Sequence, residues 1–155
     1  MKQGRRGFTF IELLVVMTVL GILASLAVFK YIDLKHRAMS VEAIADFQAI
    51  RLAAYSAWYE TGTWPVDAGA GTVPPGLTPY LSTGFTFSKP AYTLDWENFV
   101  PPGGGPSGGM QLGVVLTSSN TRLTATMAQY LGNKSPFFLI GGDLTFVIVG
   151  ADGGI

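Results

Sequence analysis

The sequence places a carboxylate within a long apolar stretch. Residues 8–29 read FTFIELLVVMTVLGILASLAVF, and Glu12 is the sole ionisable side chain among them. An acidic residue at mid-depth in a bilayer costs about 2.5–3.5 kcal/mol on insertion scales, and less near the end of a span. Even there, a buried carboxylate requires a partner. The chemistry that Glu12 indicates is therefore charge pairing in an apolar environment.

Other reactive residue types form no recognisable catalytic set. The chain has no cysteine, which excludes disulfides, thiolate metal sites and thiol nucleophiles. His36 is the only histidine, and it lies between Lys35 and Arg37. With no second histidine or cysteine to share a metal ion, we expect it to be a solvated side chain. The glycine-rich residues 100–109 lack the Lys-Ser/Thr of a phosphate-binding loop. We predict no enzyme activity, no catalytic residue, no metal site and no cofactor.

Two acids in the carboxy-terminal part leave one question about metal open. Asp143 and Asp152 fall in glycine-rich stretches. Calcium takes six to eight oxygen ligands, and two acids separated by a strand are weak support for such a site. Turn formation is the preferred interpretation, because aspartate favours turns.

Composition and charge describe one domain with an appended apolar segment. The 155 residues are 48% hydrophobic and 13% charged, against roughly 25% charged in soluble domains. Part of the surface is therefore expected to meet lipid or other subunits. Ten Lys and Arg balance ten Asp and Glu, so no nucleic-acid partner is predicted.

The apolar stretch is long enough to cross a membrane. As a helix, its 22 residues span about 33 Å, and a hydrocarbon core is about 30 Å thick. Lys2, Arg5 and Arg6 precede it, which predicts a cytoplasmic amino terminus. An ordinary secretory signal, cleaved near residues 24–27, and a generic single-pass anchor are the alternatives. Both leave the charge of Glu12 unexplained.

Residues Gly7 to Val16, GFTFIELLVV, resemble the processing and assembly signature of type IV prepilins and type II secretion pseudopilins, with Phe10 where leucine is more usual. The resemblance implies that a prepilin peptidase cuts between Gly7 and Phe8 and methylates the new amino group of Phe8. It also implies that Glu12 neutralises the amino terminus of a neighbouring subunit. Pairing turns the cost of burying either charge alone into a device that sets the register between subunits.

The same resemblance implies the partners and the location. The partners are the prepilin peptidase, other pilin or pseudopilin subunits, an inner-membrane assembly platform, and lipid before assembly. The chain would cross the inner, cytoplasmic membrane once, with its carboxy-terminal domain periplasmic and the fibre periplasmic or at the cell surface. Relatives often have a proline eight residues after Gly21, and here that position is Phe29. Whether the helix melts on assembly is therefore left open.

Residues 30–61 predict an amphipathic continuation of the apolar helix. It would end between Tyr59 and Gly62, with Gly62 as the cap and Pro65 as the stop. Charged side chains populate the other faces, Asp46 among them. The apolar residues at helical spacing are Ile44, Phe47, Ile50, Ala54, Tyr55 and Trp58.

The remaining residues predict loops and a small antiparallel sheet. We expect a turn over Leu77–Leu81, a helix from Ser118 or Ser119 to Leu131, and a hairpin of Phe137–Ile140 with Leu144–Val149 in the middle of the sheet. The other predicted strands are Phe85–Phe87, Tyr92–Phe99 and Gln111–Thr117. The fold class is α+β and pilin-like: one long helix with a sheet on its carboxy-terminal half.

The predicted organisation is a leader over 1–7, an apolar helix over 8–29, its amphipathic continuation over 30–61 and a globular part over 62–155. The predicted function is a structural subunit of a type IV pilus-like or secretion fibre. The alternative is a membrane-anchored binding or adhesion domain that never polymerises, with Trp64, Tyr80, Trp96 and the glycine-rich residues 100–109 as contacts. Pilus, secretion pseudopilus and DNA-uptake fibre share this amino terminus, so the machine and the major or minor status of the subunit stay open.

Overall fold

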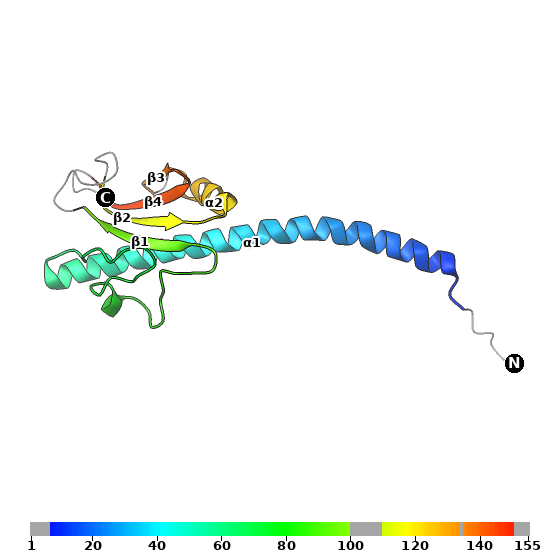
Figure 1. The fold of residues 1–155 in the computed structure, drawn as a ribbon, viewed down its shortest axis with the longest axis horizontal. Coiled ribbons are helices and arrows are strands. Elements are labelled where there is room, and N and C mark those ends of the chain that lie inside the picture. Colours follow the sequence, from blue (N-terminus) through cyan, green and yellow to red (C-terminus); the bar gives the residue numbers. More distant parts are fainter. Residues whose placement is uncertain (1–6, 100–109, 134, 151–155) are drawn as a thin grey trace. The chain divides into compact units, whose positions relative to one another are not determined.

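Helix α1 occupies Phe10–Thr61 in the computed structural model, which describes residues 7–99, 110–133 and 135–150. The chain divides into two compact units, Met1–Lys35 and His36–Ile155, which are treated separately. Figure 1 traces the order of the elements. After α1 come a 3-10 helix over Thr78–Tyr80, strands β1 (Thr93–Asn98) and β2 (Met110–Thr117), helix α2 (Thr121–Leu131), and strands β3 (Phe137–Ile140) and β4 (Asp143–Gly150).

The composition of α1 explains its length. Gly21 is its only glycine and it contains no proline, so no residue removes a backbone donor. It ends where predicted: Gly62 adopts a φ of 73°, and its N–H donates to the carbonyl of Trp58 at 2.8 Å. A left-handed glycine after the last turn is a common helix terminator. The helix runs through Gly21 and Phe29 without interruption.

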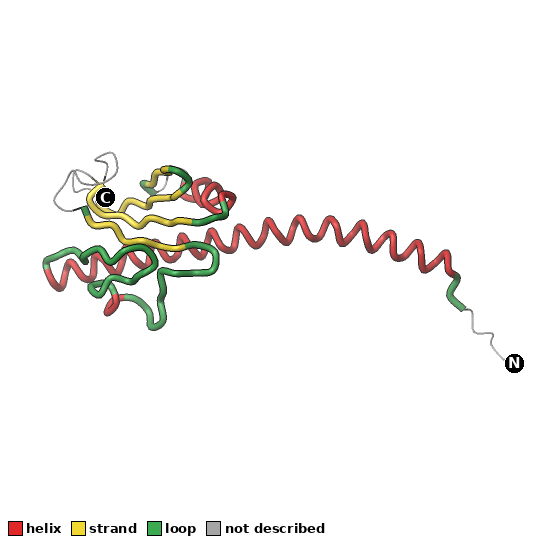
Figure 2. Tube along the Cα trace, in the orientation of Figure 1, coloured by secondary structure: helices red, strands yellow, loops and turns green. Residues whose placement is uncertain are grey.

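The four strands form one antiparallel sheet in the order β1-β2-β4-β3. Alternation decides which side chains enter the core: Leu94 and Trp96 of β1 are buried, and Asp95 and Glu97, which alternate with them, are half-buried. The sheet lies beside the carboxy-terminal half of α1 (Figure 2). The ring of Phe47 stacks on that of Phe146 with centroids 5.1 Å apart. The predicted α+β, pilin-like fold class is confirmed.

Helix α2 completes the core of the second unit. Leu123, Met127 and Leu131 are buried at the spacing of one helical face. They join a single apolar cluster that includes Phe47, Ile50 and the inward side chains of β1, β2 and β4. Trp58, predicted in the apolar stripe, is 38% exposed and stacks on Trp64 instead.

Two element predictions are wrong in detail. Phe85–Phe87 is a loop, with only an isolated bridge between Ser88 and Thr93 nearby. The Ser88 N–H bonds to the Thr86 hydroxyl, and the following Pro90 has no donor, so ladder pairing cannot extend. The side chain of Phe87 is fully buried in the core, which explains an apolar residue at this position of the loop. The cap of α2 is Asn120 rather than Ser118 or Ser119, because the Ser118 hydroxyl donates to the carbonyl of Ala91.

The hairpin and one helix face also differ from expectation. Gly141 and Gly142 both have positive φ and connect β3 to β4, as two-residue hairpin turns require. Within that hairpin, β4 is interior and β3 is an edge strand. Asp46 was predicted on an outer face, but only 7% of it is exposed. It is buried because it is paired, as described below.

Candidate functional site

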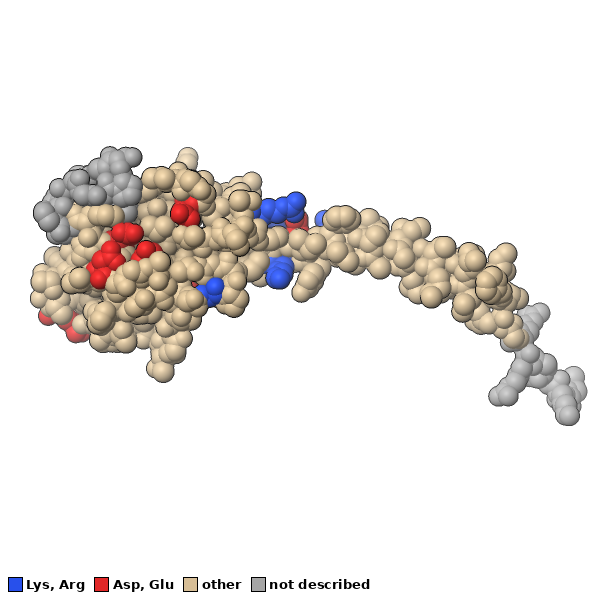
Figure 3. All heavy atoms as spheres, viewed as in Figure 1, with Lys and Arg blue, Asp and Glu red and all other residues tan. Residues whose placement is uncertain are grey.

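The first unit presents an apolar helix surface without a core of its own. Its large side chains are exposed, from Phe10 at 82% to Phe29 at 73%. On the face drawn in Figure 3, the part of α1 nearest the amino terminus shows no acidic or basic side chain. Its best window has a mean hydropathy of 2.5 and is 0% buried, so by length and composition α1 can cross a membrane. A surface of this kind requires lipid or another protein chain to cover it.

The carboxylate of Glu12 closes the first turn of α1. Its Oε2 accepts from the Thr9 backbone N–H at 2.9 Å and from the Thr9 hydroxyl at 2.7 Å. The Glu12 N–H in turn lies 3.3 Å from the Thr9 hydroxyl oxygen. This reciprocal arrangement is a capping box, which satisfies two donors that the helix start would leave unpaired. The Thr-x-x-Glu spacing was visible in the sequence, and this local role of Glu12 was missed there.

Gly7 and Phe8 precede the helix in an open stretch of chain. Neither lies in a helix or strand, and Phe8 is 77% exposed. A Cβ placed on Gly7 would meet no atom within 4 Å. The peptide bond between Gly7 and Phe8 is therefore accessible, and no packing within the described chain would obstruct a protease.

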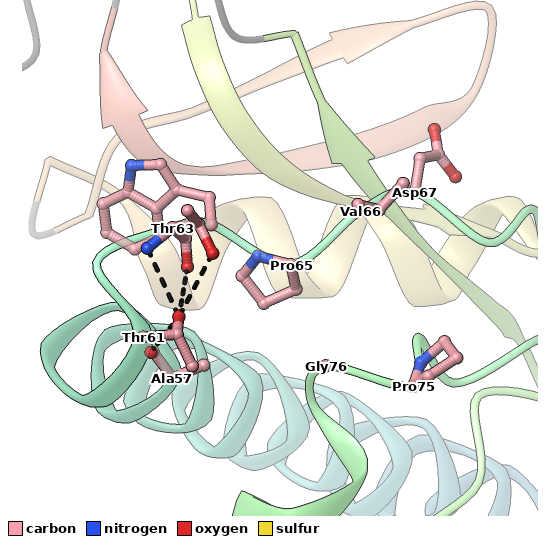
Figure 4. Close-up of a pocket in the computed structure, with 9 residues that line it drawn as sticks. Ala57, Thr61, Thr63, Pro65, Val66, Asp67, Pro75 and Gly76 are labelled. Carbon is pink, nitrogen blue, oxygen red and sulfur yellow. Dashed lines mark hydrogen bonds between the residues drawn. The ribbon is translucent and has the colours of Figure 1, made fainter.

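The second unit carries a cavity at the carboxy-terminal end of α1, with Trp64 in its wall. The cavity measures about 450 Å³, and Trp64, Pro65, Val66 and Asp67 contribute to its wall. Figure 4 shows Thr61 at its margin, where the Thr61 hydroxyl donates to the Ala57 carbonyl at 2.7 Å and accepts from the Thr63 N–H at 3.2 Å. Its lining is mainly apolar, and no catalytic pair of side chains lies in it.

Of the contacts predicted for an adhesion domain, Trp64 alone lines this cavity. Trp96 is fully buried, and its indole N–H donates to the Pro65 carbonyl at 2.9 Å. It is a core residue, so its predicted role as a surface contact is wrong. Tyr80 is half-buried and donates its hydroxyl to Glu60 at 2.6 Å. That hydrogen bond raises the pKa of the Tyr80 phenol.

Asp67, Asp95 and Glu97 lie close enough at strand β1 to interact electrostatically. Burial, and then the charge of Asp67, raise the pKa of Asp95. Burial, followed by the charges of Asp95 and Asp67, raise the pKa of Glu97. Among the residues the structure describes, no group of three or more His, Cys, Asp or Glu is placed to hold a metal ion. Asp143 begins β4, and Asp152 lies outside the described residues, as does the predicted loop over 100–109.

A buried ion-pair cluster fastens the loop before β1 to α1. Lys89 Nζ lies 2.7 Å from Asp46 Oδ2 and 3.1 Å from Glu42 Oε1. The Tyr92 hydroxyl donates to the same Asp46 oxygen at 2.6 Å. Burial, followed by the bond to Asp46, raises the pKa of Tyr92. Burial opposes the charge on Lys89, but its bonds to Asp46 and Glu42 outweigh this and raise its pKa.

His36 contacts a residue far away in the sequence. Its Nδ1 lies 3.1 Å from Nδ2 of Asn120, the cap of α2. The side chain is half-buried, so the expectation of a solvated histidine is wrong. A lone histidine in a basic stretch gave no signal for this contact, because its partner is fixed only by the tertiary fold.

The capped carboxylate lies in the first turn of an exposed apolar helix, and the sheet of the second unit packs on the carboxy-terminal half of the same helix, which is the pilin-like fold class. A family model described as the prokaryotic N-terminal methylation motif matches residues 2–28. The chain carries the amino-terminal signature of the type IV pilin family, which confirms the resemblance found in the sequence.

The chain is similar to several curated fimbrial proteins. It is 36% identical over 74 residues to the fimbrial protein EcpC of Eikenella corrodens, covering 47% of this chain and 48% of that protein. It is 37% identical over 75 residues to the type IV major pilin protein PilE1 of Neisseria gonorrhoeae, covering 48% and 35% respectively. A fimbrial protein of Pseudomonas aeruginosa is 38% identical over 58 residues, covering 37% and 38%. The matches thus span half or less of these relatives, and no solved structure matches the chain.

Proposed function

We propose that this protein is a structural subunit of a type IV pilus-like fibre, polymerised through the amino-terminal part of α1. The observation that carries the proposal is the exposed apolar surface of residues 8–29 with Glu12 as its one charge. A helix that is apolar on all sides requires burial, either in lipid or in the centre of a bundle of helices. The relatives named as pilins and fimbrial proteins support the same function.

Processing would prepare the chain for assembly. A prepilin peptidase would cut between Gly7 and Phe8 on the cytoplasmic side of the inner membrane, remove residues 1–7 and methylate Phe8. The exposure of Phe8 and the open space around Gly7 support access to this bond. The mature chain would then span the membrane once, with the second unit outside it, until an assembly platform transferred it to the fibre.

Glu12 would have one role before assembly and a second role after it. In the monomer it caps its own helix through Thr9. Cleavage creates a cationic amino group on Phe8, and in the fibre the Glu12 carboxylate would neutralise that group on a neighbouring subunit. Burying either charge alone is costly, whereas burying them together is favourable only at short range. The pair would therefore fix the axial stagger of the subunits.

Two substitutions separate the cap from the charge. Glu12→Gln retains an oxygen acceptor, and glutamine also serves in capping boxes, but the negative charge is lost. Thr9→Val removes the capping hydroxyl and leaves the charge. We expect Glu12→Gln protein to insert and be processed normally, and to appear in sheared filaments at least about tenfold less than wild type, because the amino terminus it faces is left unpaired.

Thr9→Val should reduce incorporation by less than Glu12→Gln does, since it only weakens a helix end. Quantitative immunoblotting of filament and membrane fractions measures both variants. If Glu12→Gln entered filaments at the wild-type level, the charge would have no part in assembly. If both variants were lost from filaments to the same extent and accumulated as the uncleaved precursor, Glu12 would act in processing instead.

The non-polymerising alternative keeps one supporting feature, the cavity beside Trp64. The fully buried Trp96 removes a second proposed contact from that surface. The fibre function is favoured, because a binding domain alone does not explain the exposed apolar helix or the match of residues 2–28 to the N-terminal methylation motif.

A further inference from the structure

The part of α1 within the second unit has an outer face without charged side chains. A helix on the surface of a soluble domain normally turns charged or polar residues towards solvent. Here the inner face carries core residues such as Phe47 and Ile50, which are fully buried. The exposed residues on the opposite face are Ala38, Val41, Ala45, Gln48, Leu52 and Tyr59. We call this set the outer stripe.

The outer stripe is mainly apolar and open to solvent. Val41 is 56% exposed, Leu52 is 69% exposed and Tyr59 is 78% exposed. A single exposed leucine is ordinary, but a row of apolar side chains along one helix face marks a contact with another molecule. The neighbouring charges of Glu42 and Arg51 lie about 90° to either side of the stripe, because a helix has about 3.6 residues per turn.

The spacing of the outer stripe selects a helix as its partner. Its residues follow one another at alternating intervals of three and four, which is the seven-residue repeat of a seam between two helices. The half-buried Tyr55 occupies the remaining position of this repeat, between Leu52 and Tyr59. A seam of this period packs helices lengthwise at a shallow crossing angle of about 20°. The stripe therefore fits a long apolar helix that lies along α1.

Lipid is not suited to cover the outer stripe. The exposed and charged Lys30, Asp33, Lys35 and Arg37 fall between the apolar residues 8–29 and the stripe. Charged side chains at this density remain with water and lipid headgroups, so they end the segment that hydrocarbon can surround. The stripe begins beyond them, outside the hydrocarbon. A protein surface must therefore cover it.

Every copy of the chain contains a helix of the required chemistry. Residues 8–29 form an exposed apolar segment whose one charge, Glu12, lies near its start. They cannot cover the outer stripe of their own chain, because both belong to one uninterrupted helix. A second copy can supply them.

We propose that the outer stripe is a subunit interface that packs against residues 8–29 of a second copy of this chain. The interface rests on the proposed fibre function and adds a second surface to it. Each subunit offers its apolar segment to one neighbour and receives the segment of another on its stripe. Because the two surfaces differ, the contact is heterologous, and repetition of such a contact without closure produces a helical filament.

Val41→Glu and Val66→Glu form a matched pair of variants that tests the interface. Both introduce the same charge at an exposed valine, but Val66 lies in the loop after α1, outside the stripe. Val41→Glu should be processed normally and unfold at the wild-type temperature as the full chain in detergent micelles. Its amount in sheared filaments, measured by quantitative immunoblotting, should fall at least about tenfold, because assembly would bury the new carboxylate against an apolar helix. Val66→Glu should enter filaments at the wild-type level.

A photoreactive p-benzoylphenylalanine in place of Leu52 identifies what covers the stripe. In filaments it should form a covalent dimer of this chain, and mass spectrometry should locate the cross-link within residues 8–29 of the second copy. The same group in place of Val66 should not reach that segment. Cross-links from position 52 to another protein or to other residues, or normal incorporation of Val41→Glu, would overturn the interface and leave the fibre function standing. Absence of the wild-type chain from filaments would overturn the fibre function, and the interface with it.

Discussion

At the scale of single residues, the second unit depends on a lysine that is buried between two acids. Lys89 retains only 18% of its side-chain exposure, and Asp46 retains 10%. The ammonium group also lies 5.6 Å from the centre of the Phe85 ring and 5.8 Å from that of Tyr92. A desolvated charge held by so few partners is sensitive to the loss of any one of them.

Lys89→Met should lower the free energy of unfolding by about 1–3 kcal/mol. The methionine keeps the apolar stem, and Asp46 keeps the hydrogen bond from the Tyr92 hydroxyl but loses its ion pair. Glu42→Gln is the matched control, because the Glu42 side chain is 55% exposed and surface pairs contribute less than about 1 kcal/mol. Chemical denaturation of both variants measures the difference. Equal effects would mean that burial of Asp46 is not the source of the stability.

The same cluster gives the protein an alkaline limit. The pKa of Lys89 is raised in the folded state, so its stabilisation is complete below its unfolded pKa, near 10.4, and is lost as the pH rises through the folded value. Deprotonation of Tyr92, whose pKa is also raised, acts in the same direction. The Lys89→Met variant should lose the lysine part of this alkaline sensitivity.

At the scale of elements, the end of α1 is set by backbone conformation rather than by space. Gly62 has a φ of 73°, and a Cβ added there would meet no atom within 4 Å. Gly62→Val should therefore reduce stability by about 1–2 kcal/mol through backbone strain. Gly62→Asn should reduce it by less, because asparagine tolerates the left-handed region. Thermal unfolding compares them, and an equal loss in both variants would show that conformation is not the cause.

Local patterns predicted the elements whose signals are local. Each of these signals involves only residues that are close in the sequence. They are the apolar run, the glycine at position 62 and the alternation of Leu94 and Trp96 with acids. The sequence did not reveal the burial of Asp46 or the contact of His36 with Asn120, because each depends on a partner more than 40 residues away. Phe85 and Phe87 suggested a strand because aromatic residues fit both a sheet and a core.

At the scale of the whole molecule, the two units would divide the work of a fibre subunit. The apolar part of α1 would supply lateral packing, and the Glu12 charge would set the stagger. The second unit supports its own core and would face outwards. The second unit therefore has a core of its own, whereas the apolar part of α1 requires lipid or other subunits to cover it.

Mass spectrometry of filaments sheared from producing cells tests the central claim most directly. The filament-bound chain should lack residues 1–7 and begin with a Phe8 that carries one methyl group. A Gly7→Ile variant should remain as the full-length precursor in the membrane fraction and be absent from filaments. Recovery of the full-length, unmethylated wild-type chain in membranes alone, with none in filaments, would contradict the account.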